Sequence, residues 1–270
     1  MRTRAGIDAG GTLIKIAYVD RQKLLYKLFP ASQPAAAADW VQRHLPHAQV
    51  CVTGGKAALL RPYFADSLAM GEFAAAARGA RYLAEQEGLP AGEAFILAQV
   101  GTGTSLHLAG KDGSRRLTGT GVGGGTILGL GSLLTGKTSF RDIVALAEQG
   151  RREAVDLRVC DIYEEAPPLA GDLTAANFSH PGLRQAEPEH LAAALIGMVG
   201  EVVTGMSLQA AEQYGVTHIV FAGSAFLRNR PLRETAERYV RLQGRVPLVL
   251  QNGSCCGAIG ALFSLWEEHA

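Results

Sequence analysis

The most constraining feature of the sequence is its first strand and turn, residues 6–15, which read Gly-Ile-Asp-Ala-Gly-Gly-Thr-Leu-Ile-Lys. An apolar strand brings Asp8 to a pair of glycines, and a second apolar strand begins at Leu13. Glycines let backbone amides approach an anion closely, and such a turn forms a concave anion-binding nest. A carboxylate at the strand end suits Mg²⁺ held through water, and Lys15 adds a positive charge. The pattern indicates either a phosphate-binding hairpin or a plain hairpin turn with a surface acid.

Further glycine clusters follow apolar strands along the chain. They are Gly54-Gly55, Gly101-Thr102-Gly103-Thr104, Gly119 to Gly125, Gly223-Ser224 and Gly257-Ala258-Ile259-Gly260. One glycine string is weak evidence. The occurrence of several such clusters at successive strand ends predicts several sites where the backbone approaches a ligand or another segment closely. A Rossmann fingerprint opens a helix, whereas the first glycine pair opens a strand. A Walker loop needs Gly-Lys-Ser/Thr at a helix start, and the chain has none there.

Apolar strands and helical periodicities alternate, which predicts a mixed α/β fold. The expected strands include 49–53, 94–100, 105–109, 217–222 and 246–250, and the expected helices include 72–86, 188–214, 230–242 and 257–267. Both halves share this rhythm, so we expect two similar lobes around a cleft. We place the lobes at residues 1–90 and 91–270, with no linker between them.

Composition excludes several classes of protein. The 270 residues carry a formal net charge of +1, which gives no electrostatic footprint for nucleic acid. The four cysteines have no metal-ligand spacing, so we expect reduced thiols. No apolar run approaches the ~20 residues that span a bilayer, and no signal-peptide pattern follows Met1. We therefore expect a soluble, cytoplasmic protein with no membrane partner.

Taken in order, these motifs resemble the actin-like ATPase and sugar-kinase superfamily. Within it, five strings resemble the type II pantothenate kinases, and the resemblance runs from Gly6 to about Leu265. The strings are residues 6–15, 52–55, 100–105, 123–127 and 171–178. The resemblance implies an α/β, two-lobed actin-like (ribonuclease H-like) fold with a nucleotide cleft between the lobes. It also implies a homodimer that phosphorylates pantothenate to 4'-phosphopantothenate with MgATP, the first step of coenzyme A biosynthesis.

The resemblance also assigns roles to individual residues. The implied ATP-binding residues are Asp8, Ala9, Gly10, Gly11, Thr12, Leu13, Ile14, Lys15, Thr102, Gly123, Gly124, Gly125, Thr126, Ile127, Phe140, Ser224 and Ala225. The implied substrate-binding residues are Glu72, Thr102, Thr104, Arg116, Thr174 and Ala175. Glu72 is the implied catalytic residue, and Asp8 is the implied partner of Mg²⁺ through water.

The two residues assigned to the ends of the acceptor, Glu72 and Arg116, also have ordinary structural interpretations. Glu72 is an acid of the kind favoured in a first helical turn, whereas the resemblance makes it the acceptor of a hydroxyl proton. Arg115 and Arg116 form a charge pair of the kind found on solvated hairpins. A guanidinium can also hold the pantothenate carboxylate in a bidentate fork, and we favour Arg116 for this.

Three further positions depend on the resemblance. Thr174-Ala175 resembles a substrate-contacting turn, although a turn or helix cap is the plain interpretation. Ser224-Ala225 resembles the turn on the adenosine side, where Ala225 offers only its backbone. Some relatives have a tyrosine near residues 248–250 that reaches the neighbouring subunit's substrate, and none stands there in this chain.

Two other functions stay open. One is a kinase of the same fold that acts on an amino sugar or another small alcohol. The other is a nucleotide-binding sensor with little catalysis.

Overall fold

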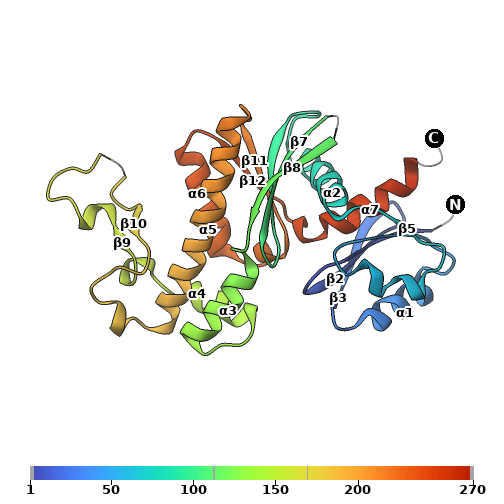
Figure 1. Cartoon of the computed structure of the whole chain (residues 1–270), viewed down its shortest axis with the longest axis horizontal. Helices are drawn as coiled ribbons and strands as arrows, with labels where there is room; N and C mark the ends of the chain where they lie inside the picture. Colours follow the sequence, from blue (N-terminus) through green and yellow to red (C-terminus); the bar gives the residue numbers. More distant parts are fainter. Residues whose placement is uncertain (1–2, 112, 169, 268–270) are drawn as a thin grey trace.

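The computed structural model describes residues 3–111, 113–168 and 170–267, and these build two five-stranded mixed sheets flanked by helices (Figure 1). The first sheet has the order β3-β2-β1-β4-β5. Its strands are β1 (Arg4–Ala9), β2 (Leu13–Asp20), β3 (Lys23–Pro30), β4 (Gln49–Thr53) and β5 (Leu68–Ala69). The first three strands are antiparallel, and β4 joins β1 in parallel. The hairpin and the parallel strand together place the β1–β2 turn beside the end of β4.

The second sheet has the order β12-β11-β6-β7-β8. Its strands are β6 (Phe95–Val100), β7 (Thr104–Gly110), β8 (Gly113–Thr120), β11 (His218–Ala222) and β12 (Val246–Val249). The pair β6–β7 is an antiparallel hairpin, and β11 pairs with β6 in parallel. The second sheet thus repeats the design of the first, with its own tight turn, 101–103, at the corresponding strand end.

The helices cover both sheets. They are α1 (Pro34–His44), α2 (Glu72–Gln86), α3 (Gly124–Thr135), α4 (Phe140–Ala147), α5 (Pro188–Gln213), α6 (Arg230–Leu242) and α7 (Cys256–Glu267). Short 3₁₀ helices occupy 57–59, 61–63, 152–154, 159–161, 183–185, 224–226 and 253–255. Helix α1 packs on one face of the first sheet, and α3 to α6 build the core of the second.

Helices α2 and α7 lie between the two sheets and share a core with both (Figure 1). Close backbone contact depends on glycine here, because a β carbon on Gly79 would lie 1.9 Å from the carbonyl oxygen of Cys256. A β carbon on Gly260 would lie 1.9 Å from that of Ala75. Since α7 comes from the end of the chain yet also packs on β1 and β4, the division at residue 90 stays a prediction.

A projecting segment separates α4 from α5 and carries the two-stranded sheet of β9 (Leu157–Arg158) and β10 (Thr174–Ala176), seen at the left of Figure 1. Arg152 anchors this segment through ion pairs of 2.9 Å with Asp156 and 2.7 Å with Glu201 of α5. Burial lowers the pKa of Arg152, but the two carboxylates outweigh it and the net pKa is raised.

One strand was missed and one expectation needs correction. Arg115 and Arg116 lie in β8, the outer strand of the β7–β8 hairpin. The sequence analysis did not predict this strand, because it is polar and carries no apolar run that marks it. Thr174-Ala175 is likewise part of a strand, β10, and not a turn or helix cap.

The prediction that no apolar run is long enough to span a bilayer was wrong for α5. Among the described residues this helix passes that test by length and composition. However, 61% of its most apolar window is buried inside the protein, and its buried residues pack in the core of the second sheet. A buried core helix passes the same test, so the helix alone indicates no membrane.

Candidate active site

A polar cleft of about 300 Å³ opens where the two tight turns meet. Its walls come from the β1–β2 turn, the start of α2 and the turn of the β6–β7 hairpin, with Ser224, Ser254 and Gly257 completing it. The turns approach closely, because a β carbon on Gly11 would lie 3.2 Å from the hydroxyl oxygen of Thr102. The two sheets therefore bring both glycine-threonine turns to one place.

Asp8 and Lys15 face each other across the β1–β2 hairpin. They are register partners, and the Lys15 ammonium donates to an Asp8 carboxylate oxygen at 3.0 Å. Both side chains are nearly buried, at 11% and 12% exposed. The amide of Gly10 donates to the carbonyl of Leu13 at 3.0 Å and closes the turn. Lys15 therefore neutralises Asp8 here, and its predicted contact with phosphate stays a prediction.

The carboxylate of Asp8 sits in a cradle that only glycines leave open. A β carbon on Gly54 would lie 2.5 Å from an Asp8 oxygen, and one on Gly257 would lie 2.9 Å from the Asp8 carboxyl carbon. Thr53, the parallel register partner of Asp8, has a buried hydroxyl with no partner among the described residues. Mg²⁺ prefers oxygen ligands and keeps several waters. These residues fit the predicted magnesium position, with Asp8 as the charged partner.

Lys56 supports the β1–β2 turn from the loop that follows β4, and no motif marked this residue in the sequence analysis. Its amide donates to the carbonyl of Ala9 at 2.9 Å, and its ammonium donates to the carbonyl of Gly11 at 2.8 Å. Because a peptide unit is planar and trans, fixing the Gly11 carbonyl also fixes the opposite direction of the Thr12 amide. Lys56 thereby sets the orientation of an amide in the predicted phosphate turn.

Glu72 is the first residue of α2 and stands at the cleft, exposed to solvent. Partial desolvation raises the pKa of its carboxyl, the negative charge of Asp8 raises it further, and Lys15 opposes both effects. One carboxylate oxygen lies 3.6 Å from the position of a β carbon on Gly55. A carboxylate with a raised pKa beside the predicted phosphate turns has the chemistry of a general base.

Arg116 lies beside the cleft and not in its wall. Its guanidinium sits over the ring of Phe73, 5.5 Å from the centroid, and Phe73 lines the cleft next to Glu72. Arg116 and His107 are register partners across β7 and β8, where a bulge shifts the pairing. The structure therefore places the predicted carboxylate-binding cation one side chain away from the predicted base.

The two threonines of the second turn, Thr102 and Thr104, differ in how their side chains are placed at the cleft. Thr104 lines the cleft, but its hydroxyl donates to the carbonyl of Val122 at 2.7 Å, so its donor is already used within the protein. Thr102 lines both the cleft and an adjoining apolar chamber. Of the two threonines, Thr102 is therefore the better placed for the predicted contact with phosphate or substrate.

The apolar chamber has a volume of about 660 Å³ and opens from the polar cleft. The two share Thr12, Leu13, Gly101, Thr102, Ser224 and Ser254. Apolar side chains dominate the remaining wall, among them Tyr26, Leu28, Leu128, Phe140, Val144, Ala225 and Leu227. Large apolar pockets with a few polar groups are typical of small-molecule sites. The predicted nucleotide residues Phe140, Ser224 and Ala225 therefore all line this chamber.

Other predicted nucleotide residues do not open into the chamber with their side chains. Ile127 is fully buried in the core of the second sheet, and Ala9 and Ile14 are also buried. The amide of Gly123 donates to the Thr126 hydroxyl at 3.1 Å. The amides of Gly124 and Gly125 donate at 2.8 Å to the carbonyls of Gly101 and Thr102. The glycine cluster thus braces the second turn from behind, although Gly124 and Gly125 also line the chamber.

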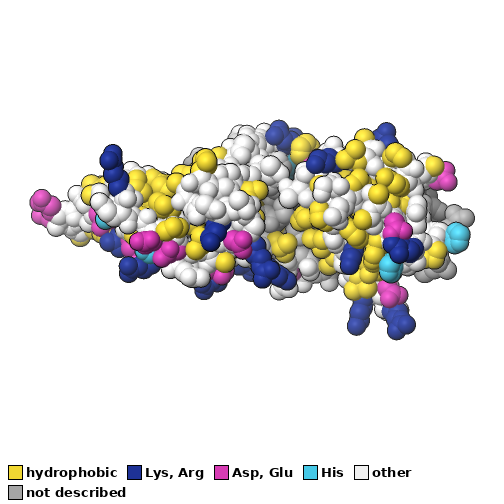
Figure 2. All heavy atoms as spheres, turned by 90° about the horizontal axis from the view of Figure 1, so that it is seen from below, with side chains coloured by type: hydrophobic (Ala, Val, Ile, Leu, Met, Phe, Trp, Pro, Cys, Tyr) yellow, Lys and Arg dark blue, Asp and Glu magenta, His cyan; other side chains and the backbone are white. Residues whose placement is uncertain are grey.

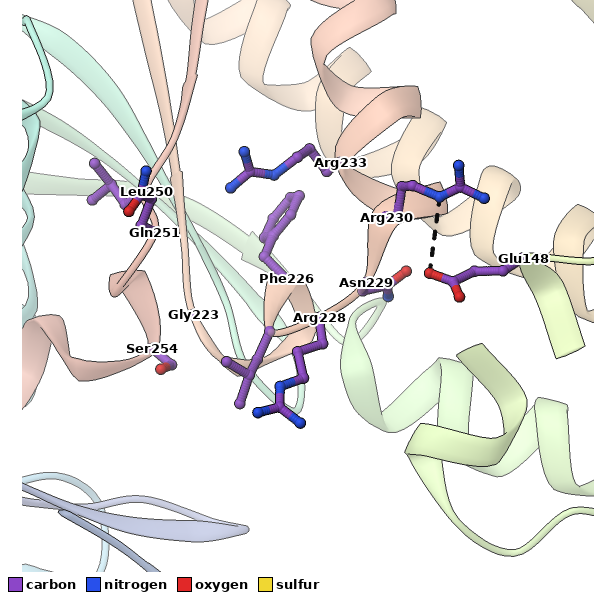
Figure 3. A pocket seen from close by; sticks show the side chains of 11 residues that line it. Glu148, Gly223, Phe226, Arg228, Asn229, Arg230, Arg233, Leu250, Gln251 and Ser254 are labelled. Carbon is purple, nitrogen blue, oxygen red and sulfur yellow. Dashed lines mark ion pairs between the residues drawn. The ribbon is translucent and has the colours of Figure 1, made fainter. Parts of the chain in front are cut away.

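A second opening of about 400 Å³, rich in arginine, continues from the chamber past Leu227, Arg228 and Ser254 (Figure 3). Arg228, Arg230 and Arg233 line it, and Arg230 pairs with Glu148 at 3.9 Å. Figure 3 shows the guanidinium of Arg228 pointing away from those of Arg230 and Arg233. Arg228 has φ of 53°. No motif marked this opening in the sequence.

Thr174 and Ala175 are not brought to the cleft of their own chain. They lie in β10 on the projecting segment, where the Arg152 guanidinium donates to the Thr174 hydroxyl at 3.0 Å. The same cluster holds Tyr239, whose hydroxyl donates to Glu201 at 2.8 Å. Tyr239 also went unnoticed in the sequence, because it lies in an ordinary amphipathic helix.

Solved structures with the same architecture include two that hold a bound nucleotide. The activator of the 2-hydroxyisocaproyl-CoA dehydratase from Clostridium difficile, with bound ADPNP, matches with a TM-score of 0.67 and 15% identity, covering 98% of this chain and 95% of that one. A ROK family glucokinase from Streptomyces griseus, in complex with glucose and AMPPNP, matches with a TM-score of 0.57 and 14% identity, covering 97% and 98%. The fold is thus that of the two-lobed actin-like ATPases and kinases.

The sequence comparison is more specific. A family model described as Fumble matches residues 32–264. The type II pantothenate kinase of Bacillus cereus (strain ATCC 10987 / NRS 248) is 39% identical over 277 residues, covering all of both chains. That of Staphylococcus epidermidis is 40% identical over 266 residues, covering 96% of this chain and 99% of the other. The chain belongs to the Fumble family, the family of the type II pantothenate kinases.

Proposed function

We propose that this chain transfers the γ-phosphoryl group of ATP to the primary hydroxyl of pantothenate, giving 4'-phosphopantothenate and ADP at the first step of coenzyme A biosynthesis. The observation that carries the proposal is the meeting of the Gly10-Gly11 and Gly101-Gly103 turns over Asp8, with Glu72 beside them. Membership of the type II pantothenate kinase family supports the choice of acceptor.

ATP is held, in this proposal, with its phosphates between the two turns and its adenosine in the apolar chamber. Amides of the turns donate to phosphate oxygens, as in other anion nests, and Phe140 and Ala225 pack against the base. Asp8 would hold Mg²⁺ through water, and the ion would supply charge neutralisation at the phosphates. Phosphoryl transfer depends mainly on such positioning and charge neutralisation.

Glu72 acts on the acceptor. The primary hydroxyl oxygen forms a bond to the γ-phosphorus while the bond from that phosphorus to the bridging oxygen of ADP breaks. Glu72 orients the hydroxyl and takes its proton late, as the new bond forms. Arg116 holds the carboxylate at the far end of the acceptor in a bidentate fork.

A homodimer forms part of the proposal. Thr174 and Ala175 are far along the chain's projecting segment and do not line the cleft of their own chain. A contact between them and a substrate therefore requires the cleft of a second subunit. The cytoplasm, with no nucleic acid or membrane partner, is the proposed location. On the face seen in Figure 2, Lys and Arg side chains are spread along the protein with Asp and Glu among them, in keeping with the near-neutral charge of the chain.

A coupled assay of ADP release tests the proposal with four samples: pantothenate, pantetheine, N-acetylglucosamine and no acceptor. We expect turnover with pantothenate well above the rate without acceptor. Turnover only with the sugar would replace the proposal by the amino sugar kinase. ATP binding without turnover on any acceptor would replace it by the nucleotide sensor.

A further inference from the structure

The short segment 250–255, between β12 and α7, contributes to all three openings. Ser254 lines the polar cleft, the apolar chamber and the arginine-rich opening. Asn252 and Cys255 line the chamber, and Gln251 lines the arginine-rich opening, where Figure 3 shows it with Ser254. The position of this segment therefore sets the shape of the space between the predicted phosphate turns and the predicted adenosine wall.

The segment is in contact with the turn that carries Ser224 and Ala225. The amide of Gly223, which precedes that turn, donates to the carbonyl of Gly253 at 3.1 Å. A β carbon on Gly253 would lie 3.0 Å from the α carbon of Ala222, so the two stretches of backbone pack directly on each other. Because packed interiors transmit displacement, a shift of the segment also shifts the turn at 224–225.

Glu87, at the end of α2, holds the start of the segment. The amide of Gln251 donates to both carboxylate oxygens of Glu87, at 3.1 and 3.4 Å, although the two residues are 164 positions apart in the sequence. Arg233 of α6 holds the neighbouring peptide, because its guanidinium donates to the carbonyl of Val249 at 3.0 Å. Two side chains of opposite charge thus fix one amide and one carbonyl where the segment leaves β12.

The helix itself does not favour a carboxylate at this position. Glu87 is the C-cap residue of α2, and its amide donates to the carbonyl of Leu83 at 2.9 Å. A helix C-terminus carries partial negative charge, so an acid there is unfavourable. Partial burial raises the pKa of Glu87, and the Gln251 amide and the charge of Arg233 oppose this rise. The contacts that favour the carboxylate are therefore those with the 250–255 segment and its other support.

We propose that Glu87 is a positioning residue for the nucleotide. It holds the 250–255 segment and, through that segment, the turn at 224–225 in the shape that receives the adenosine. Glu87 lines none of the three openings, so it acts through Gln251 and not by contact with the ligand. Small displacements of positioning groups are costly, because the bound geometry must be held closely. The place of the nucleotide rests on the proposed function, whereas the hold on the segment rests on the hydrogen bonds to Gln251.

Glu87→Met tests the proposal, because methionine keeps the length of the side chain and offers the Gln251 amide no oxygen. We expect KM for ATP to rise about tenfold, the equivalent of about 1.4 kcal/mol, with KM for the acceptor unchanged. The melting temperature should stay close to that of the wild type, since an acid opposed by the helix is removed. Glu87→Gln keeps one acceptor oxygen and should restore KM for ATP to within about twofold of the wild type. Gln86→Met, at the exposed last residue of α2, should change neither constant.

Calorimetric titration with ADP, which needs no acceptor, separates the failure of this proposal from that of the proposed function. A wild-type protein that binds no ADP would overturn both. If the wild type binds ADP but turns over none of the acceptors, only the kinase function fails, and the dissociation constant of ADP takes the place of KM for ATP. An unchanged constant in Glu87→Met would overturn the role of Glu87 alone. So would an equal rise in Glu87→Gln, or a rise in both Michaelis constants with a fall of several degrees in melting temperature, which would assign Glu87 to the stability of the fold.

Discussion

Gly54→Ala is the sharpest test of how the fold holds Asp8. Gly54 follows β4 with φ of 95°, and an added β carbon would lie 2.5 Å from both the Ala9 carbonyl oxygen and an Asp8 oxygen. A side chain in a left-handed conformation costs about 1–2 kcal/mol, and forcing extra volume into a packed site costs about 1–3 kcal/mol more. We expect a total loss of about 2–5 kcal/mol in the free energy of unfolding.

Gly88→Ala is the matched control. Gly88 has a similar φ of 107°, but nothing lies within 4 Å of its added β carbon. The control should therefore lose only the conformational part, about 1–2 kcal/mol. Chemical denaturation with linear extrapolation measures both losses, and calorimetric titration measures the affinity for ADP. Gly54→Ala should also weaken ADP binding, because Asp8 and the carbonyl of Ala9 must move, while Gly88→Ala should bind as the wild type does.

Equal losses of stability in the two variants would refute this reasoning, since they would show that the β1–β2 turn moves aside without cost. A wild-type affinity for ADP in Gly54→Ala, together with the expected loss of stability, would refute the placement of phosphates at this turn instead. The two results separate the packing argument from the assignment of the site.

Four further predictions follow from the cleft and its supports. Glu72→Gln should leave calorimetric ADP affinity unchanged and lower kcat about 10²–10⁴-fold; wild-type kcat should fall as pH drops through the raised pKa of Glu72, because a protonated carboxyl accepts no proton, and the variant should lack this fall. Arg116→Ala should raise KM for pantothenate more than KM for pantetheine, which has no carboxylate, and equal effects would exclude the clamp. Lys56→Ala should raise KM for ATP but not for pantothenate at an unchanged melting temperature, and no change in either would remove Lys56 from the phosphate turn. Arg152→Met should cost about 3–5 kcal/mol in denaturant unfolding, because the buried carboxylate of Asp156 and the partly buried carboxylate of Glu201 lose their cation, and a loss below 1 kcal/mol would contradict this.

The two-lobed fold was predictable because its signals are local. Gly10 and Gly11 predict a tight turn by residue type alone. The helix from Glu72 to Gln86 was predicted with its observed bounds. Strand β8 escaped because its polar residues have no apolar alternation to mark them. Strands are recognised in a sequence by alternating apolar residues, which occur only where one face of the strand is buried. An exposed edge strand such as β8 lacks this alternation.

The supports of the site were not predictable for a different reason. Lys56 holds a carbonyl 45 residues away in the sequence, and only the parallel pairing of β4 with β1 brings the two together. Gln99 looks like any polar residue in a strand until the fold shows that it lines the cleft and that its side-chain oxygen is buried with no hydrogen-bond partner in the part of the chain that the structure describes. Residue type indicates candidate binding groups, whereas the pairing of distant strands decides which other groups position them.

The projecting segment carries a predicted substrate-binding motif that the fold does not bring to the cleft of its own chain. Thr174 and Ala175 resemble a substrate-contacting motif, yet the structure fixes them on β10 through Arg152 and the cluster around Glu201. This anchoring is strong, because Arg152 pairs with two carboxylates and Tyr239 adds a hydrogen bond to Glu201. These contacts hold the segment against α5, and Thr174 and Ala175 do not line the cleft of their own chain. The proposed contact of these two residues with substrate therefore stays tied to the proposed second subunit.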